Sequence, residues 1–253
     1  MRIGLVALPL ALGPMLAACG AEPQPAPTPT ASTTDAGPRT LVAAALRNIP
    51  LGPRIAGPGG PETTTVLTAA DGTVLGQMVS YVACPAPEGS EDDMAEADAD
   101  PAPGQVTPPE GECDTAAQAE GALYTYVHRI GLGRPDMEAP DPAAPVPQTM
   151  VFRMTRPAAG FANVIGYDVE QAREALGDDA DIKVQLDNGQ LVWRVVGGDG
   201  WRDGETLTFF WQSTQPPEGS AKAYELQMDS LTASANAPWP GDRDAADAVA
   251  GGM

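Results

Sequence analysis

The chain has 253 residues, of which 34 are acidic and 14 basic, and its formal net charge is −20. Nucleic-acid phosphates are bound by clustered Lys and Arg, so a chain with only two lysines, Lys183 and Lys222, argues against a nucleic-acid partner. Gly and Pro contribute 28 and 27 residues, a share typical of linkers, whereas a hydrophobic content of 43% excludes a wholly disordered chain.

The N-terminus has the order of an export signal. Arg2 precedes an apolar run at residues 3–12, which is too short to span a membrane as a helix, and small residues follow. The run Leu16-Ala17-Ala18-Cys19 resembles the lipobox of bacterial lipoproteins, in which the cysteine thiol is acylated and the chain is cut just before it. An ordinary secretory signal is the alternative.

The lipobox resemblance implies that residues 1–18 are a signal peptide and that Cys19 carries fatty acyl chains such as palmitate. Several acyl chains anchor firmly in a membrane, because each buried methylene contributes roughly 0.8 kcal/mol. Gly20 is not the Asp that retains such lipoproteins at the inner membrane. The resemblance therefore implies the outer membrane of a cell that has one, and leaves open whether the domain lies on the periplasmic or the surface face.

Residues 19–40 are predicted to be a tether between the lipid and the folded domain. Pro23, Pro25, Pro27 and Pro29 alternate there with small and polar residues, which leaves no apolar face to bury and favours extended polyproline geometry. At roughly 3.1 Å per residue, such a segment holds a domain well away from the membrane surface.

Residues 41–240 carry a β pattern, and residues 241–253 are predicted to be a disordered tail. A short helix is predicted at 41–49, and Asp71-Gly72 and Asn188-Gly189 predict hairpin turns. Because no strand–helix alternation is present, we expect one antiparallel β-sandwich-like domain with one or two short helices. The predicted strands are Thr63–Thr68, Thr73–Ala83, Ala122–Ile130, Gln148–Thr155, Ile182–Asp187, Gln190–Val196, Glu205–Ser213 and Ala221–Met228.

One further helix is predicted at residues 169–176. Asp168 is a favourable N-cap residue, and Gln171 stands three residues later, as in a capping box. Gly177 is a favourable residue at which the helix ends. A helix of this length is an accessory to a β domain.

Alternation assigns faces to two of the predicted strands. Side chains two residues apart share a face, so one apolar set faces one way while Phe210 faces the other. We predict that this set forms one cross-strand sheet face in the middle of the core. Its members are Leu191, Trp193, Val195, Leu207, Phe209 and Trp211.

Cys84 and Cys113 remain once Cys19 is assigned to lipid, and two thiols in an exported chain predict one disulfide. The alternatives are two unpaired thiols or a redox pair, although no Cys-x-x-Cys spacing occurs. Between the two cysteines, residues 85–112 contain nine acids and no Lys or Arg. We predict a solvated acidic loop closed at its base, and a site for a cation or a basic partner is the alternative.

Six ring-bearing side chains are candidates for ligand binding. They are Tyr124, Tyr126 and His128, which alternate along one predicted strand, and Trp201, Phe210 and Trp239. Such rings on an outer face could stack on sugars. The alternatives are a merely polar outer face for the first three, and packing under loops or over an end of the sandwich for the last three.

The sequence supports no catalytic residue, metal site or cofactor. A single His cannot build a zinc site with two or three His ligands, and no segment has the spacing of a calcium-binding loop. We therefore expect a lipid-anchored envelope protein whose β domain has a binding or structural role and meets the membrane, an envelope glycan or an envelope protein. The alternatives are a carbohydrate-binding module and a glycan hydrolase with paired carboxylates, which requires two acids in one cleft.

Overall fold

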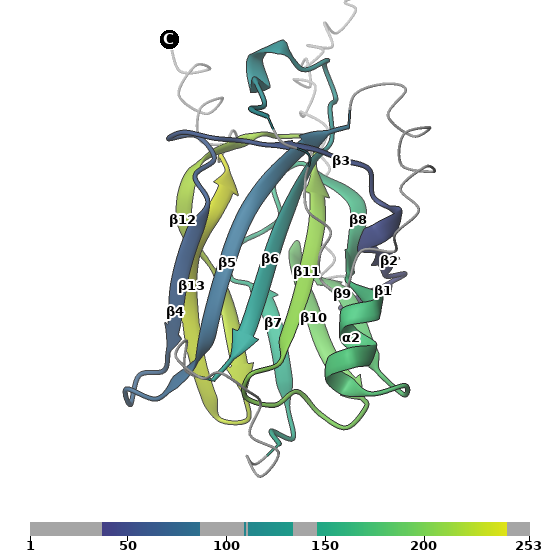
Figure 1. The fold of residues 1–253 in the computed structure, drawn as a ribbon, viewed down its shortest axis with the longest axis vertical. Helices are drawn as coiled ribbons and strands as arrows, with labels where there is room; N and C mark the ends of the chain where they lie inside the picture. The colour runs from purple at the N-terminus through teal and green to yellow at the C-terminus, as the bar shows by residue number, and fades with distance from the viewer. Residues whose placement is uncertain (1–36, 87–108, 110, 134–145, 242–253) are drawn as a thin grey trace, which may run out of the picture. The chain divides into compact units, whose positions relative to one another are not determined.

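Two β-sheets face each other across one core, which confirms the predicted mainly β, sandwich-like single domain (Figure 1). The computed structural model describes residues 37–86, 109, 111–133 and 146–241. The predicted signal peptide, the predicted lipidation site Cys19, and most of the predicted tether, acidic loop and tail lie outside these ranges.

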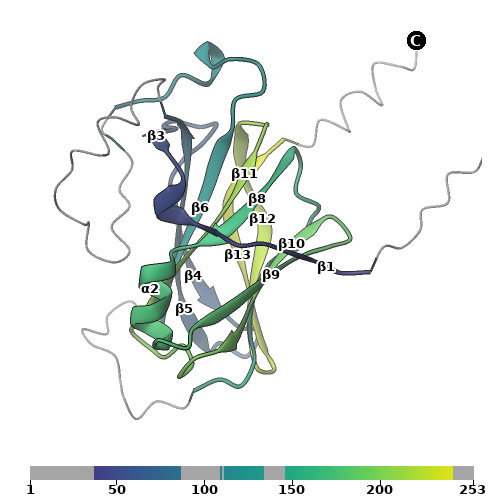
Figure 2. The ribbon, with the colours of Figure 1, turned by 90° about the vertical axis from the view of Figure 1, so that its right-hand side faces the viewer.

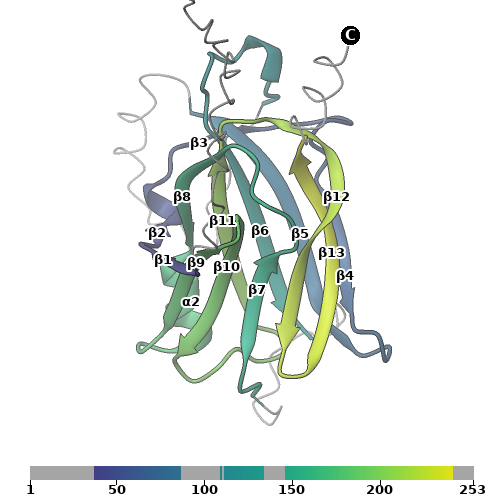
Figure 3. The same ribbon diagram turned by 180° about the vertical axis from the view of Figure 1, so that it is seen from behind.

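The first sheet has six strands, all paired antiparallel (Figure 3). In spatial order they are β1 (Arg39–Leu41), β9 (Asp181–Asp187), β10 (Gln190–Gly197), β7 (Met150–Met154), β12 (Pro217–Met228) and β13 (Leu231–Pro240). The predicted hairpin turn joins β9 to β10, with positive φ angles of 47° at Asn188 and 79° at Gly189. Because β1 starts at Arg39, the folded domain begins two residues before its predicted start at residue 41.

The second sheet has seven strands. In spatial order they are β2 (Ala44–Ala45), β8 (Phe161–Tyr167), β11 (Thr206–Ser213), β6 (Tyr124–Leu132), β5 (Val74–Pro85) and β3 (Leu51–Arg54), with β4 (Thr63–Thr68) also paired to β5. Only β2 and β8 pair in parallel among the described strands. The Asp71-Gly72 turn joins β4 to β5, so both predicted hairpins are confirmed.

One side of the sandwich is closed by edge strands from different sheets. β4 and β13 lie side by side (Figures 1 and 3). The hydroxyl of Thr65 donates to the carbonyl of Asn236 at 3.0 Å, although the two strands share no backbone ladder.

On the opposite side the N-terminal segment crosses from one sheet to the other (Figure 2). β1 pairs with β9, β2 pairs with β8, and only Leu46–Asn48 forms a short 3₁₀ helix. The helix predicted at 41–49 is therefore wrong. Leu41 packs against the main core and Leu46 against a second cluster, so pairing with two sheet edges overrides local helix propensity.

The predicted strand faces are correct, but the predicted sheet is not. Leu191 and Trp193 on β10 and Phe209 and Trp211 on β11 are all buried in the main core. β10 and β11, however, belong to opposite sheets, so these side chains meet across the sandwich instead of lying along one sheet face.

The predicted helix α2 (Val169–Leu176) is confirmed with its caps. The Asp168 carboxylate accepts the backbone N–H of Gln171 at 3.0 Å, and the N–H of Gly177 donates to the carbonyl of Arg173 at 2.9 Å. The helix leads from β8 in one sheet to β9 in the other, and it lies beside β11 (Figure 1).

Candidate functional site

The three aromatic side chains proposed as a ligand platform are buried. Trp201 and Phe210 have exposed fractions of 0%, and Trp239 has 4%. Trp201 and Trp239 belong to the main core, and Phe210 packs in a second cluster with Leu46 and Leu51 of the N-terminal segment. The prediction that these three rings face a ligand is therefore wrong. The alternative, that they pack inside the domain, agrees with the structure.

Tyr124, Tyr126 and His128 do share one face of β6, but that face is the inner one. All three are buried in the described structure, so neither the polar outer face nor the ligand-binding face predicted for them exists here. Tyr126 stacks on Trp211 with ring centroids 4.5 Å apart, and its hydroxyl donates to the carbonyl of Gln215 at 3.1 Å.

His128 is a core residue with one polar contact. Its Nδ1 lies 2.9 Å from the hydroxyl of Ser80, and its ring lies 4.2 Å from the ring of Tyr224. Its Nε2 is buried without a partner among the described residues. Burial lowers the pKa of His128 to about 3, so the imidazole is neutral at ordinary pH and is closed to any ligand.

The predicted disulfide is present between Cys84 and Cys113, whose Cα atoms lie 6.2 Å apart. Cys84 lies near the end of β5, and the backbone N–H of Cys113 donates to the carbonyl of Arg54 on β3. The bridge thereby fixes the segment that re-enters the domain after the acidic loop.

The described residues hold no group of three or more His, Cys, Asp or Glu side chains with the geometry of a metal site. Within the same ranges, no helix combines the length and apolar character that crossing a bilayer requires.

One cavity of about 440 Å³ opens between α2 and the outer side of the seven-stranded sheet. Its volume is within the range of about 300 to 1,000 Å³ typical of small-molecule sites. Its lining is mostly polar, and comes from β6, α2 and the segment at the start of β11. The lining residues are Arg129, Gln171, Glu174, Ala175, Gly204, Glu205 and Thr206.

Gln171 is the unusual member of this lining. Its exposed fraction is 5%, and its Oε1 is buried without a hydrogen-bond partner among the described residues. In a full capping box this side chain would accept the N–H of Asp168, but that N–H donates instead to the carbonyl of Thr208 at 2.9 Å. A buried acceptor without a partner costs about 1 to 3 kcal/mol.

Glu205 is held in place by its backbone. Its carbonyl accepts the indole N–H of Trp201 at 3.1 Å and the backbone N–H of Leu132 at 3.0 Å. Burial raises the pKa of the Glu205 carboxyl. The backbone N–H of Arg202, which donates to this carboxylate, and the charge of Arg202 lower the pKa, and the Asp199 carboxylate raises it. Trp201 does not line the cavity. It lies in the core and fixes the backbone of Glu205, which does line the cavity.

Arg129 brings a cation to the same cavity. It is exposed on the outer face of β6, and it forms no ion pair with any described residue. The cavity thus contains one guanidinium and two carboxylates, those of Glu174 and Glu205, that do not neutralise one another by direct contact.

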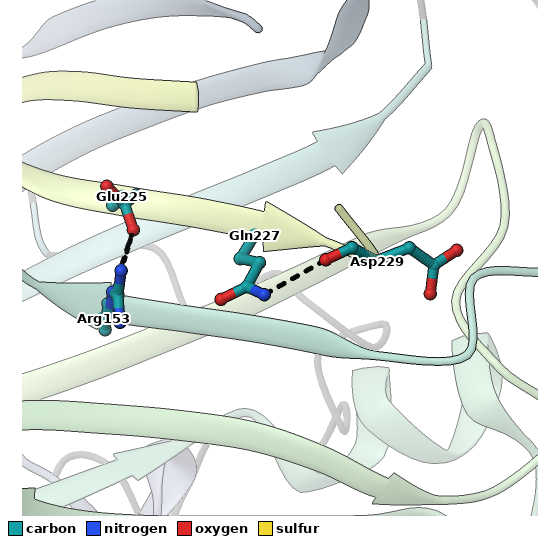
Figure 4. A network of polar contacts seen from close by, with 4 residues as sticks. All are labelled: Arg153, Glu225, Gln227 and Asp229. Atoms are coloured by element: carbon teal, nitrogen blue, oxygen red, sulfur yellow. Dashed lines mark hydrogen bonds and ion pairs between the residues drawn. The ribbon is translucent and has the colours of Figure 1, made fainter. Parts of the chain in front are cut away.

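A second group of polar side chains lies on the outer face of the six-stranded sheet and in the turn after β12, and its members form hydrogen bonds and an ion pair (Figure 4). Arg153 Nε donates to Glu225 at 2.9 Å, and the Gln227 amide donates to the carbonyl of Asp229 at 3.1 Å. The Asp229 carboxylate accepts the backbone N–H groups of Gln148 and Thr149 at 2.8 and 2.9 Å. These contacts fix the turn after β12 against the start of β7.

Comparison of the chain with protein-family models, with curated proteins and with solved structures found no match.

No sequence pattern identifies this cavity. Gln171 was assigned only to the helix cap, while Arg129, Glu174 and Glu205 are separated by long stretches of chain. One sequence feature hints at the unpaired amide of Gln171. Asp168, whose backbone N–H a capping-box Gln would accept, directly follows a strand, and the neighbouring strand can take that N–H instead.

Proposed function

We propose that this chain is a lipid-anchored protein of the bacterial cell envelope, whose β-sandwich is a non-enzymatic binding module with the α2 cavity as its ligand site. The lipobox-like run before Cys19 supports the anchor. The Cys84–Cys113 disulfide supports an oxidising compartment outside the cytoplasm. The Pro-rich segment between Cys19 and β1 supports a domain held away from the membrane it is anchored to.

The observation that carries the binding role is the amide of Gln171. A buried polar atom in a native protein nearly always has a hydrogen-bond partner. Four side-chain atoms of the described residues have none, and of these only Gln171 Oε1 belongs to a residue that lines this cavity of ligand size. An envelope glycan fragment or an envelope protein segment with N–H or O–H groups is the kind of partner that this site fits.

The anchor is tested with the full chain expressed in a bacterial host. Wild-type protein should incorporate a fatty-acid probe and fractionate with membranes, because the thiol of Cys19 is the expected acyl acceptor. Cys19→Ser should remain unlabelled. Equal labelling of the two proteins would overturn the lipoprotein assignment.

The binding role is tested with the mature chain bearing Cys19→Ser, immobilised and exposed to soluble fragments of the bacterial envelope. The parent should retain material that Gln171→Met and Arg129→Gln release. Arg194→Gln is the matched control, because Arg194 is an exposed arginine on β10 in the other sheet. Retention that is equal in all four proteins would show that the cavity is not the binding site.

A second function, glycan hydrolysis, is favoured by one observation. Glu174 and Glu205 line the same cavity, and burial raises the pKa of Glu205, as in the acid of a paired-carboxylate glycosidase. An enzyme of this kind would release new reducing ends from envelope glycan, and Glu205→Gln would abolish the release. Glycan that is bound but not cut by the parent chain favours the binding module.

A further inference from the structure

The α2 cavity separates its charges in space. Arg129 lies on β6, Glu174 on α2 and Glu205 next to the first residue of β11, so three different segments of the chain supply the charged groups. An Arg beside two Glu side chains on a protein surface would ordinarily pair with one of them. Arg129 instead has no described carboxylate within ion-pair distance.

The separation is maintained by fixed backbone. Register pairs Arg129 with Thr208 on β11 and with Val79 on β5, in the middle of the seven-stranded sheet. Glu205 is fixed through its carbonyl by Trp201 and Leu132. The backbone that carries Arg129 and Glu205 is therefore fixed, and the cavity that both residues line presents groups of both signs of charge to a ligand.

Gln171 on α2 lines the same cavity. Its Oε1 has no described partner and its side chain is almost fully buried. Among the usual ligand groups, an ammonium or a peptide N–H satisfies such an oxygen, whereas a carboxylate does not.

We infer that the α2 cavity binds a small zwitterion, with its carboxylate on Arg129 and its ammonium between Glu174 and Glu205. The inference rests on the proposed binding function and names the ligand class of that site. Guanidinium binds carboxylate in a planar, two-pronged geometry, so Arg129 suits that end of the ligand. An ammonium beside Glu205 also offsets the cost of keeping that partly buried carboxyl charged. A cavity of about 440 Å³ accommodates a dipeptide.

The test uses the mature Cys19→Ser chain and three probes in titration calorimetry: alanyl-alanine, its N-acetyl derivative and its C-terminal amide. The dipeptide should bind with one site. Each derivative lacks one of the two charges and should bind at least about tenfold more weakly, the usual effect of losing a charge-assisted hydrogen bond.

Variants assign each charge to its partner. Arg129→Gln should weaken binding of the dipeptide and abolish the difference in affinity between the dipeptide and its amide. Glu205→Gln should reduce the difference in affinity between the dipeptide and its acetyl derivative, because Glu174 remains beside the ammonium. Gln171→Met, which keeps the backbone N–H that Asp168 caps, should weaken all three probes. Arg194→Gln should bind all three like the parent. Urea midpoints equal to that of the parent show that each variant is folded.

The outcomes separate this inference from the proposed function. Absence of dipeptide binding, or equal binding of all three probes, overturns the zwitterion assignment. If envelope material is still retained in a manner that depends on Gln171 and Arg129, the binding function stands and only the ligand class is wrong. If neither the dipeptide nor envelope material depends on these two residues, both are wrong.

Discussion

The indole N–H of Trp193 donates a hydrogen bond of 2.8 Å to the carbonyl of Gly166, and this bond joins the two sheets through the core. Trp193 lies on β10 and Gly166 on β8. A second bond between the sheets runs from the indole of Trp211 on β11 to the hydroxyl of Tyr224 on β12, at 3.2 Å. The core is therefore specified by directional contacts as well as by apolar packing.

Trp193→Phe and Trp239→Phe form a matched pair that measures the bond to Gly166. Both replace a buried indole by a smaller ring, but the N–H of Trp239 has no described partner. Trp193→Phe leaves the Gly166 carbonyl without its donor, so it should lower the free energy of unfolding by about 1 to 3 kcal/mol more than Trp239→Phe. Urea unfolding of both variants checks this. Equal losses would mean that the bond contributes nothing to stability.

Phe210 supplies a second stability prediction. Its side chain is fully buried under the N-terminal segment that contains Leu46 and Leu51. Phe210→Ala should therefore lower the free energy of unfolding by about 3 to 5 kcal/mol, as removal of a core ring does. Val66→Ala is the control, because Val66 on β4 is 47% exposed and should change stability by less than about 0.5 kcal/mol.

A urea midpoint for Phe210→Ala close to that of Val66→Ala would show that the N-terminal segment does not cover this face in solution.

The same segment carries Arg54, whose guanidinium lies 4.0 Å from the centre of the Tyr81 ring. Burial raises the pKa of Tyr81 to about 12, partly offset by this arginine. A titration of Tyr81 near pH 10 would therefore also indicate an uncovered face.

The strands that were predicted correctly from the sequence are rich in β-branched and aromatic residues. β13 was missed because it consists largely of small residues and prolines. Ala233, Ala235 and Ala237 on that strand are buried, so small side chains suffice to face the aromatic core, and Pro is tolerated because β13 ends the six-stranded sheet. β8 was missed for another reason: Asn163 has a positive φ of 61°, and the register with β11 shifts near that end.

The candidate site is harder to predict from the sequence than the strands are, because it depends on how distant segments pack together. Alternation identified a face shared by Tyr126 and His128, but could not determine which side of the sheet faces the core. That depends on the N-terminal segment and on the opposite sheet. The α2 cavity requires β6, α2 and β11 to meet, and no local pattern encodes that meeting.

The disulfide supplies a third prediction. Replacing both Cys84 and Cys113 by Ser should lower the free energy of unfolding by about 3 to 4 kcal/mol, because the bridge no longer restricts a loop of about 30 residues in the unfolded chain. Unfolding of the parent with and without a thiol reductant should give the same difference. A double variant as stable as the parent would show that the bridge only closes the acidic loop.

His128 supplies the last prediction, which concerns acid. Burial lowers its pKa to about 3 in the folded protein, against an ordinary value of 6.5. Between these two values the unfolded chain binds a proton that the folded protein excludes, so stability is full above pH 6.5 and falls as pH decreases. From pH 7 to pH 5 the loss from this one group should be about 2 kcal/mol, and over this range it depends little on the folded pKa.

The test compares the parent with the double variant Ser80→Ala, His128→Phe, since the Ser80 hydroxyl is the polar partner of the imidazole. The neighbouring tyrosines Tyr126 and Tyr224 do not titrate in this range, because the ordinary tyrosine pKa is about 10 and burial raises it further in both. Surface carboxylates affect both proteins alike. The parent should therefore lose about 2 kcal/mol more than the double variant between pH 7 and pH 5. Parallel pH profiles would mean that His128 accepts a proton inside the folded domain, and that its Nε2 has access to water or to a partner beyond the described residues.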